Sequence, residues 1–170
     1  NSTENNPSKS KLILPILIIL VLAVGIWFGS QFFKSTLFTV MEVPKFELTD
    51  QNNQKISNKD MLGKVYLVEF FFSKCPTICP VMNANMRSIE DEINNPNFGI
   101  VSISIDPEND TPQLLKEHAT KIGAKSKNWH FLTGDRDYIG KLADEFDIYV
   151  GDKDDESESL NHSGMIALVD

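Results

Sequence analysis

Residues 64–80, KVYLVEFFFSKCPTICP, decide the fold. Residues 64–72 are a dense run of β-branched and aromatic side chains, which is typical of a strand buried on both faces, as in a parallel sheet. A loop that carries Cys75 and Cys79 follows, and Pro80 suits the first turn of a helix. The stretch therefore predicts a strand, a cysteine-bearing loop and a helix in succession.

The rest of the chain repeats this alternation. We expect helices over residues 81–93, 112–122 and 136–146. We expect a buried strand at residues 99–105, an apolar strand at 164–169, and short strands at 44–49, 55–56 and 129–132. We further expect a strand starting at 149–150 and an acidic loop at 151–159. Thr111 or Asp110 can cap the second helix, with Pro112 at its first position. The pattern predicts an α/β fold, a central mixed sheet flanked by helices.

Bulk composition narrows the function. The chain has 170 residues, enough for one domain, and its net charge of -8 argues against nucleic acid as a partner. Only two cysteines are present, and they lie close together, which excludes a disulfide framework. A lone close pair of this kind indicates a metal site or a redox pair.

Residues 12–33 are almost wholly apolar and contain no charged side chain. About 20 helical residues cross the hydrocarbon core of a membrane. A cleaved signal peptide is a competing interpretation, although Ala23 and Gly25 form a poor cleavage site, and a buried core helix is another. We expect a single transmembrane signal anchor at 12–33, with a linker at 34–43 and the folded domain at 44–170.

Lysines flank the apolar stretch and bear on its orientation. Lys9 and Lys11 precede it and Lys34 follows it, so the positive-inside rule places residues 1–11 in the cytoplasm as a short tail. The domain then lies on the extracytoplasmic side of a single-pass membrane protein, in the periplasm or an equivalent compartment, where thiols can be oxidised. The chain stops after Asp170 in what resembles the middle of a hairpin, which suggests a truncated C-terminal end.

Cys75 and Cys79 are predicted to lie where a strand ends and a helix begins, a common place for ligands in α/β sheets. The helix N-terminus and Lys74 are both expected to lower the thiol pKa values, which favours metal binding and redox chemistry equally. Two thiolates under-coordinate zinc, whereas Cu(I) accepts two or three soft ligands. The question is then which third ligand is available.

Three histidines are candidates for that ligand. His118 is expected in mid-helix and partly exposed, and His130 in a short strand as a hydrogen-bonded core residue. His162 follows the acidic loop and immediately precedes a predicted buried strand, which favours it without settling the choice. Met82 and Met86 could add thioethers, but methionines at this helical spacing are usually core residues.

Four segments, in order and at matching spacing, resemble the SCO/SenC family, the copper-binding assembly factors of cytochrome c oxidase. They are VYLVEFFFSKCPTICP at 65–80, SIDPENDTP at 104–112, LTG at 132–134 and NHS at 161–163. The resemblance runs from about residue 44 to residue 170. It implies a thioredoxin-like fold, one N-terminal membrane span and copper held by Cys75, Cys79 and His162.

The resemblance further implies a copper metallochaperone rather than an enzyme. It would hold Cu(I), with Cu(II) as a second oxidation state, and deliver it to the binuclear copper site of a cytochrome c oxidase subunit or maintain the thiols of that site. Other copper chaperones or thiol reductants are further expected partners. Two residues depart from the family pattern, because Thr77 and Asn161 stand where many members carry an acidic residue. Both losses lower the local negative charge and bear on metal affinity.

A membrane-anchored thiol-disulfide oxidoreductase is the alternative. Such proteins, in the families that share this fold, carry C-x-x-C and a proline before the strand expected here near Gly164. This chain has three residues between its cysteines and no proline between Pro112 and Asp170. His162 stands at about that place instead, which favours a metal site.

Overall fold

The computed structural model describes residues 15–16, 18–27, 41–153, 160–162 and 164–170, in two units that divide after Met41. In the first unit, residues 15–16 and 18–27 are helical. Among the described residues, no helix combines the length and apolarity that a membrane crossing requires. The predicted tail at 1–11 and parts of the predicted span and linker lie outside the described residues. The span therefore stays a prediction from the sequence.

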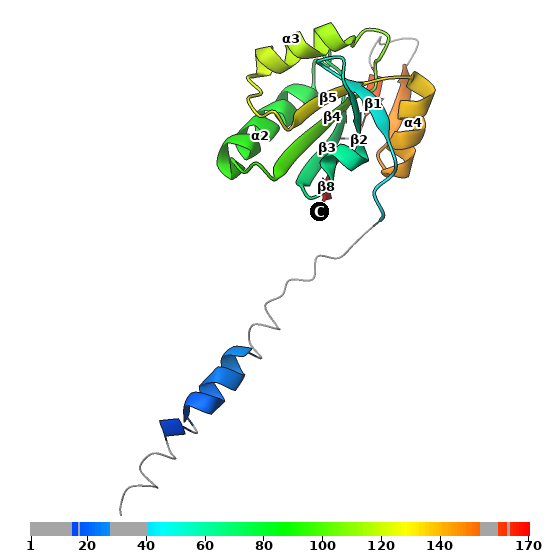
Figure 1. The fold of residues 1–170 in the computed structure, drawn as a ribbon. Coiled ribbons are helices and arrows are strands. Elements are labelled where there is room, and N and C mark those ends of the chain that lie inside the picture. Colours follow the sequence, from blue (N-terminus) through cyan, green and yellow to red (C-terminus); the bar gives the residue numbers. More distant parts are fainter. Residues whose placement is uncertain (1–14, 17, 28–40, 154–159, 163) are drawn as a thin grey trace, which may run out of the picture. The chain divides into compact units, whose positions relative to one another are not determined.

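The second unit is built on a six-stranded mixed sheet with the order β2-β1-β5-β4-β3-β8 (Figure 1). Its strands are β1 (Glu47–Asp50), β2 (Lys55–Ser57), β3 (Val65–Phe71), β4 (Phe98–Ser104), β5 (Trp129–Thr133) and β8 (Ile166–Val169). Strands β3, β4 and β5 pair in parallel, whereas β1 and β8 join antiparallel at either side. The predicted α/β fold with a mixed sheet is confirmed.

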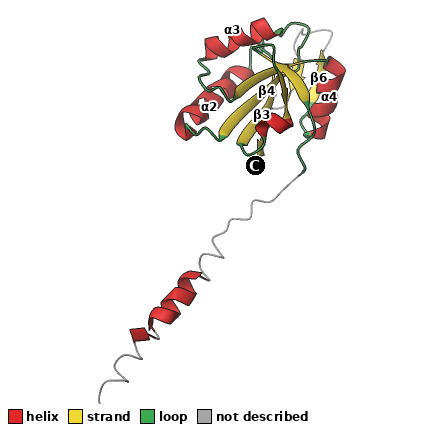
Figure 2. Ribbon diagram, viewed as in Figure 1, coloured by secondary structure: helices red, strands yellow, loops and turns green. Residues whose placement is uncertain are grey.

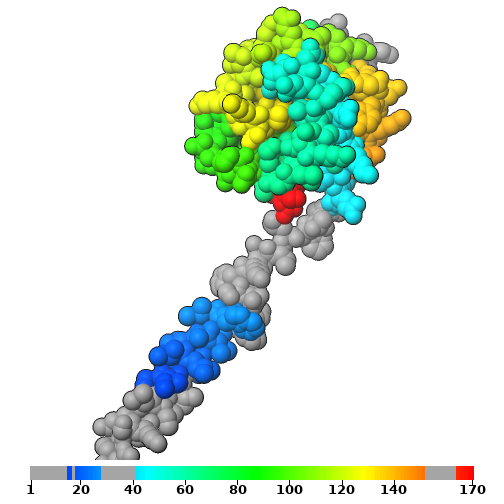
Figure 3. All heavy atoms as spheres, viewed as in Figure 1, coloured from blue at the N-terminus to red at the C-terminus, as the bar shows by residue number. Residues whose placement is uncertain are grey.

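Helices cover both faces of this sheet (Figures 1 and 2). They are α2 (Ile78–Ile93), α3 (Pro112–Ile122) and α4 (Arg136–Glu145), with a short 3₁₀ helix η1 (Asn58–Met61) before β3. Helices α2 and α3 lie on one face and α4 lies on the other. In the space-filling view, α3 and the first two strands form adjoining parts of the visible surface (Figure 3).

The core explains why the central strands are continuous hydrophobic runs. Val68, Phe70 and Phe71 of β3 are fully buried, and every residue of β4 is buried. Strands with helices packed on both faces have no solvent side on which to place polar residues. Three polar residues are exceptions: the Ser102 hydroxyl donates to Glu69 inside the sheet, and the Ser104 hydroxyl donates to Asp110.

The helix ends follow the sequence with one correction. Thr111 caps α3 by accepting a hydrogen bond from the Leu114 N–H at 3.4 Å, as predicted, and Pro112 opens the helix. Helix α2, however, begins at Ile78 rather than at residue 81. The prediction placed Pro80 at the first turn but took Ile78 and Cys79 as part of the loop, because the helical spacing of apolar residues begins only at residue 81. Cys79 therefore belongs to the helix.

A separate two-stranded sheet pairs β6 (Val150–Lys153) with β7 (Leu160–His162). The predicted acidic loop at 151–159 is wrong for residues 151–153, which form part of β6. Residues 154–159 lie outside the described residues. Val150 stands opposite His162 in the antiparallel pairing, so the backbone of His162 is fixed at the end of a hairpin strand.

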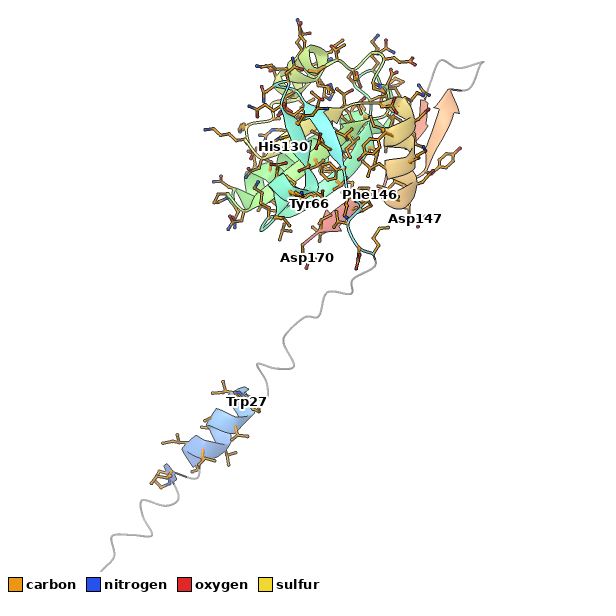
Figure 4. The ribbon with its side chains drawn as sticks, turned by 45° about the vertical axis from the view of Figure 1, so that its right-hand side comes forward. Trp27, Tyr66, His130, Phe146, Asp147 and Asp170 are labelled. Atoms are coloured by element: carbon orange, nitrogen blue, oxygen red, sulfur yellow. The ribbon has the colours of Figure 1, made fainter. Side chains whose placement is uncertain are left out.

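The last strand is less buried than its composition predicts. Ile166 is 39% exposed and Leu168 is 61% exposed, although Val169 is buried. Because β8 is last in the strand order, only β3 packs beside it in the described part of the chain. Asp170, labelled in Figure 4, lies at the end of the sheet where β3 begins, since Val169 pairs with Tyr66. The cysteine loop follows the opposite end of β3.

Candidate metal centre

The cysteine loop is a tight reversal between β3 and α2. The Cys75 N–H donates to the Phe72 carbonyl at 3.2 Å, which turns the chain immediately after the strand. The Cys75 sulfur then lies 3.7 Å from the Thr77 hydroxyl. Cys79 follows in the first turn of α2, so both sulfurs belong to one compact segment at the C-terminal end of a central strand.

Both cysteines are thiols in this structure, and both are buried, with 8% of Cys75 and 2% of Cys79 exposed. Burial raises the pKa of the Cys79 thiol well above its ordinary value, and its neighbours Cys75 and Glu69 add to that rise. The expectation that the helix N-terminus and Lys74 lower the pKa is therefore wrong for Cys79, because desolvation of a thiolate outweighs the helix dipole there. A cation placed between the sulfurs would reverse this balance.

A cavity of about 340 Å³ opens beside the two cysteines. Ten residues line it, from the cysteine loop, α2 and α3: Ser73, Cys75, Cys79, Pro80, Asn83, Ala84, Arg87, His118, Lys121 and Ile122. The sequence contained a signal for this wall, because Cys79, Asn83 and Arg87 follow one another at intervals of four on α2. That spacing places them on one helical face, but without α3 opposite, it does not reveal a cavity.

His118 lies beside the cysteine cavity, a position that the sequence did not reveal. It is a partly exposed residue of α3, as predicted, and it also lines the cavity beside the cysteines. Its ring packs 5.4 Å from that of Phe71, and its Nε2 lies 3.3 Å from the Asn83 amide nitrogen. Burial lowers the pKa of His118, with Asp110 opposing that effect and Lys121 reinforcing it. The imidazole is therefore neutral at physiological pH.

Asp110 ties the cysteine loop to the sheet, a role that the sequence did not reveal. Its buried carboxylate accepts hydrogen bonds from the Ser73 N–H at 3.0 Å and from the Ser73 hydroxyl. The same carboxylate accepts a third bond from the Ser104 hydroxyl at 2.5 Å. The segment DPENDT before α3 thus has a structural function, which is to hold the loop two residues before Cys75.

The structure describes His130 completely, whereas it describes only the backbone of His162. His130, labelled in Figure 4, lies in β5 and is largely buried, as predicted, but its Nδ1 is 3.7 Å from the Asp50 carboxylate and makes no hydrogen bond to the described residues. The backbone of His162 ends β7, and its side chain lies outside the described residues, as does that of Asn161. Within the described part, no three histidine, cysteine or acidic side chains converge as a metal site. The three-ligand set therefore stays a prediction.

The donor chemistry of the described pair nevertheless fits a soft metal. Two sulfurs within five residues, buried and beside a cavity, match the preference of Cu(I) for few, soft ligands. Met82 and Met86 are 4% and 0% exposed and fill the core beneath α2, as predicted. Their burial leaves the thiols as the soft ligands of this cavity wall.

Comparison with known proteins gives consistent matches. The family model described as SCO1/SenC matches residues 35–170. The chain is 39% identical over 95 residues to the SCO1 protein homolog of Bacillus subtilis, covering 55% of this chain and 49% of that protein. It spans about half to just under two thirds of the length of the first relatives it matches, from 49% to 63%.

Two solved structures share the fold. BsSco, described as a member of the Sco family of cytochrome c oxidase assembly proteins that has a disulfide switch, aligns with a TM-score of 0.65 and 34% identity, over 75% of this chain and 76% of that one. Copper-bound ScoI of Bradyrhizobium japonicum aligns with a TM-score of 0.62 and 26% identity, over 76% and 83%. The mixed α/β fold, a central sheet flanked by helices, fits the thioredoxin-like Sco fold, and the family match covers the cysteine loop and all four sequence motifs. The chain belongs to the SCO1/SenC family.

Proposed function

We propose that the protein is a copper metallochaperone that binds one copper ion through Cys75, Cys79 and His162. The observation that carries the proposal is the pair of buried thiols, 8% and 2% exposed, in one five-residue segment beside a cavity. Burial keeps the Cys79 pKa high in the absence of metal, so a cation is needed to hold both thiolates there. The copper-bound relative from Bradyrhizobium japonicum supports copper as that cation.

The third ligand is proposed from sequence position and from the resemblance. His162 ends a hairpin strand whose partner strand leads back to α4, and its neutral imidazole would complete a thiolate–thiolate–imidazole set. Cu(I) accepts this set readily, and Cu(II) with greater strain. A hairpin strand is a separate element from the cysteine loop, so the third ligand can detach while the thiolates still hold the metal.

Copper would leave by ligand exchange, without a change in its oxidation state. The recipient's ligands replace His162 first and the cysteines afterwards, and the protein takes up protons as its thiolates are released. We propose the copper-site subunit of cytochrome c oxidase as the recipient. The description of BsSco as a cytochrome c oxidase assembly protein supports this choice.

A thiol-disulfide oxidoreductase acting on the recipient's cysteines is the second candidate. The disulfide switch described for BsSco favours it, and both cysteines lie within one short loop in this chain. The two functions predict different metal behaviour. A chaperone must bind copper stoichiometrically, whereas a reductase needs only to cycle its thiols.

The test is a copper titration of the reduced full chain in neutral detergent, with affinity measured by competition against a Cu(I) chelator. We expect one Cu(I) per chain. His162→Ala should weaken binding by at least about tenfold to hundredfold, which is the cost of losing a residue that only supports a metal ligand. His130→Ala, which removes a histidine held beside Asp50 in the core, serves as the control. Retained disulfide exchange without stoichiometric copper would favour the reductase, and equal affinity in the two variants would exclude His162 as a ligand.

Anchoring is proposed from the sequence alone. We propose that residues 12–33 span a membrane once and leave the domain on the extracytoplasmic face. The uncharged apolar run and the lysines that flank it support this orientation. Protease added outside intact cells or spheroplasts should digest the domain, and recovery of the chain in the fraction not associated with membranes would contradict the anchor.

A further inference from the structure

The cavity beside the cysteines has a charge that contrasts with the chain as a whole. The chain carries 24 acidic and 16 basic side chains, yet the cavity lining contains Arg87 and Lys121 and no aspartate or glutamate. His118 contributes a neutral imidazole because burial lowers its pKa. A cavity that holds cationic groups in an acidic protein favours an anionic ligand.

Of the two cationic side chains in the cavity lining, Lys121 is the one that makes no ion pair among the described residues. Arg87 is paired with both Glu90 and Asp91, which neutralise its guanidinium. In the part of the chain that the structure describes, no ion pair involves Lys121. Its ammonium group is close enough to His118 to act on that imidazole. Lys121 is therefore the group that an anion in the cavity would meet.

Asn83 provides an independent sign of a ligand. Its side chain is 6% exposed and lines the cavity, and its Oδ1 has no hydrogen-bond partner among the described residues. Buried polar atoms without a partner are rare in folded proteins, because each costs the free energy of its lost hydration. An N–H or O–H group on a bound molecule would satisfy this atom.

The two cysteines indicate which reaction a ligand in this cavity could undergo. Cys75, with 8% exposed, is more accessible than Cys79, with 2%, and both line the cavity. A volume of about 340 Å³ lies within the range of small-molecule pockets. A molecule held by Lys121 and Asn83 would therefore share the cavity with a nucleophilic sulfur.

We propose that this cavity is a binding site for small carboxylate-bearing disulfides, and that it makes the reduced cysteine pair selective for anionic over cationic ones. The Cys75 thiolate, its proton lost to solvent, attacks one sulfur of the bound disulfide. A Cys75–sulfur bond forms, the disulfide bond of the ligand breaks, and an anionic thiolate leaves and takes up a proton. Cys79 then displaces the second thiol, so the protein dithiol is oxidised by two electrons and the disulfide is reduced to two thiols. This proposal does not depend on copper binding.

The test uses the reduced, copper-free full chain in neutral detergent and three symmetric disulfides. Dithiodipropionate is anionic, hydroxyethyl disulfide is neutral and cystamine is cationic. The rate of each is divided by its rate with a small model thiol, which removes differences in intrinsic reactivity. We expect dithiodipropionate to have the highest normalised rate and cystamine the lowest, with the difference shrinking as salt is added.

Matched variants assign the preference to the cavity. Lys121→Gln should lower the normalised rate of dithiodipropionate about three- to tenfold and leave hydroxyethyl disulfide unchanged. Lys121→Arg should keep the preference. Lys116→Gln removes the same charge from an exposed position of α3 outside the lining and should behave as the wild type. Equal normalised rates for the three disulfides, or equal effects of Lys116→Gln and Lys121→Gln, would overturn the proposal.

Discussion

The carboxylate of Asp110 accepts a hydrogen bond from the backbone N–H of Ser73 at 3.0 Å, across 37 residues of sequence. The Ser73 hydroxyl donates to the same carboxylate. Because Ser73 lies two residues before Cys75, this buried contact fixes the start of the cysteine loop against the segment that leads into α3. Loop position, and with it the separation of the two sulfurs, depends on a residue that would never touch the metal.

Asp110→Asn should therefore weaken both the fold and the metal site. An amide offers one oxygen in place of two, and its NH₂ group would face the Ser73 N–H or a serine hydroxyl. Loss of hydrogen bonds to a charged acceptor predicts a fall of about 2–3 kcal/mol in the free energy of unfolding. Because Cys75 would be held less firmly in place, Cu(I) binding should become roughly tenfold weaker. Urea unfolding and chelator competition measure the two effects.

The exposed Glu117 of α3 offers a control for this change. Glu117→Gln removes one negative charge from α3, where the carboxylate accepts a 3.3 Å bond from the exposed Gln113 side chain. It should alter neither stability nor copper affinity. Wild-type copper affinity in Asp110→Asn would show that the loop holds its position without the carboxylate.

Stability should fall with acid in a way that depends on His118. Burial lowers the pKa of His118, and also that of His130, below the ordinary value of 6.5. Below about pH 6.5 these histidines are protonated in the unfolded chain but remain neutral in the folded chain. The free energy of unfolding therefore keeps its full value above about pH 6.5 and decreases as pH falls toward the pKa values of the folded state. In His118→Gln, unfolding free energy measured in urea should decline less steeply from about pH 7.5 to about pH 5.5.

Replacing both histidines should flatten the profile further. The double variant His118→Gln, His130→Gln is the comparison, since each imidazole is partly buried and each lies on a different element. A wild-type slope in His118→Gln would mean that its imidazole is protonated as readily in the folded chain as in the unfolded one.

Local patterns predicted the central elements well. The apolar run of β3, the Thr111 cap and the spacing within α4 depend on neighbours in sequence, and the structure confirms them. The cavity could not be predicted in this way, because Asn83 and His118 meet only after α2 and α3 pack together. The raised pKa of Cys79 was missed for the same reason, since burial is a property of the assembled core. The helix N-terminus and Lys74 predicted a thiolate at Cys79, whereas the burial of this residue in the folded chain favours the thiol.

Copper binding should release protons. Because burial raises the pKa of Cys79, that side chain is a thiol at neutral pH, and a metal must displace its proton. Cu(I) added to the reduced chain in weak buffer at about pH 7.5 should release at least one proton per bound ion. In Cys79→Ser the release should fall by about one proton, a difference that a pH indicator measures. Identical release from the two proteins would show that Cys79 is already a thiolate.

The buried Glu69 should tune this thiol. Glu69 is fully buried in β3, where it accepts a 2.6 Å bond from the Ser102 hydroxyl, and Ser102 in turn accepts a 2.9 Å bond from Trp129 Nε1. After burial and Cys75, its negative charge is a further cause that raises the pKa of Cys79. A negative charge disfavours a nearby thiolate, so its removal must shift the thiol equilibrium toward the thiolate.

Glu69→Gln keeps the shape of the side chain and an oxygen for Ser102 while removing the charge. In a Cys75→Ser background, where Cys79 is the only thiol, the pH profile of iodoacetamide alkylation should move to lower pH. It should remain above that of a model thiol, because burial is the larger cause. The rate at a fixed pH below the thiol pKa should rise about two- to fivefold, because a lower pKa gives a larger thiolate fraction. Glu92→Gln removes an exposed charge from α2, the helix that carries Cys79, and should leave the profile in place. A profile unmoved by Glu69→Gln would mean that burial alone keeps Cys79 protonated.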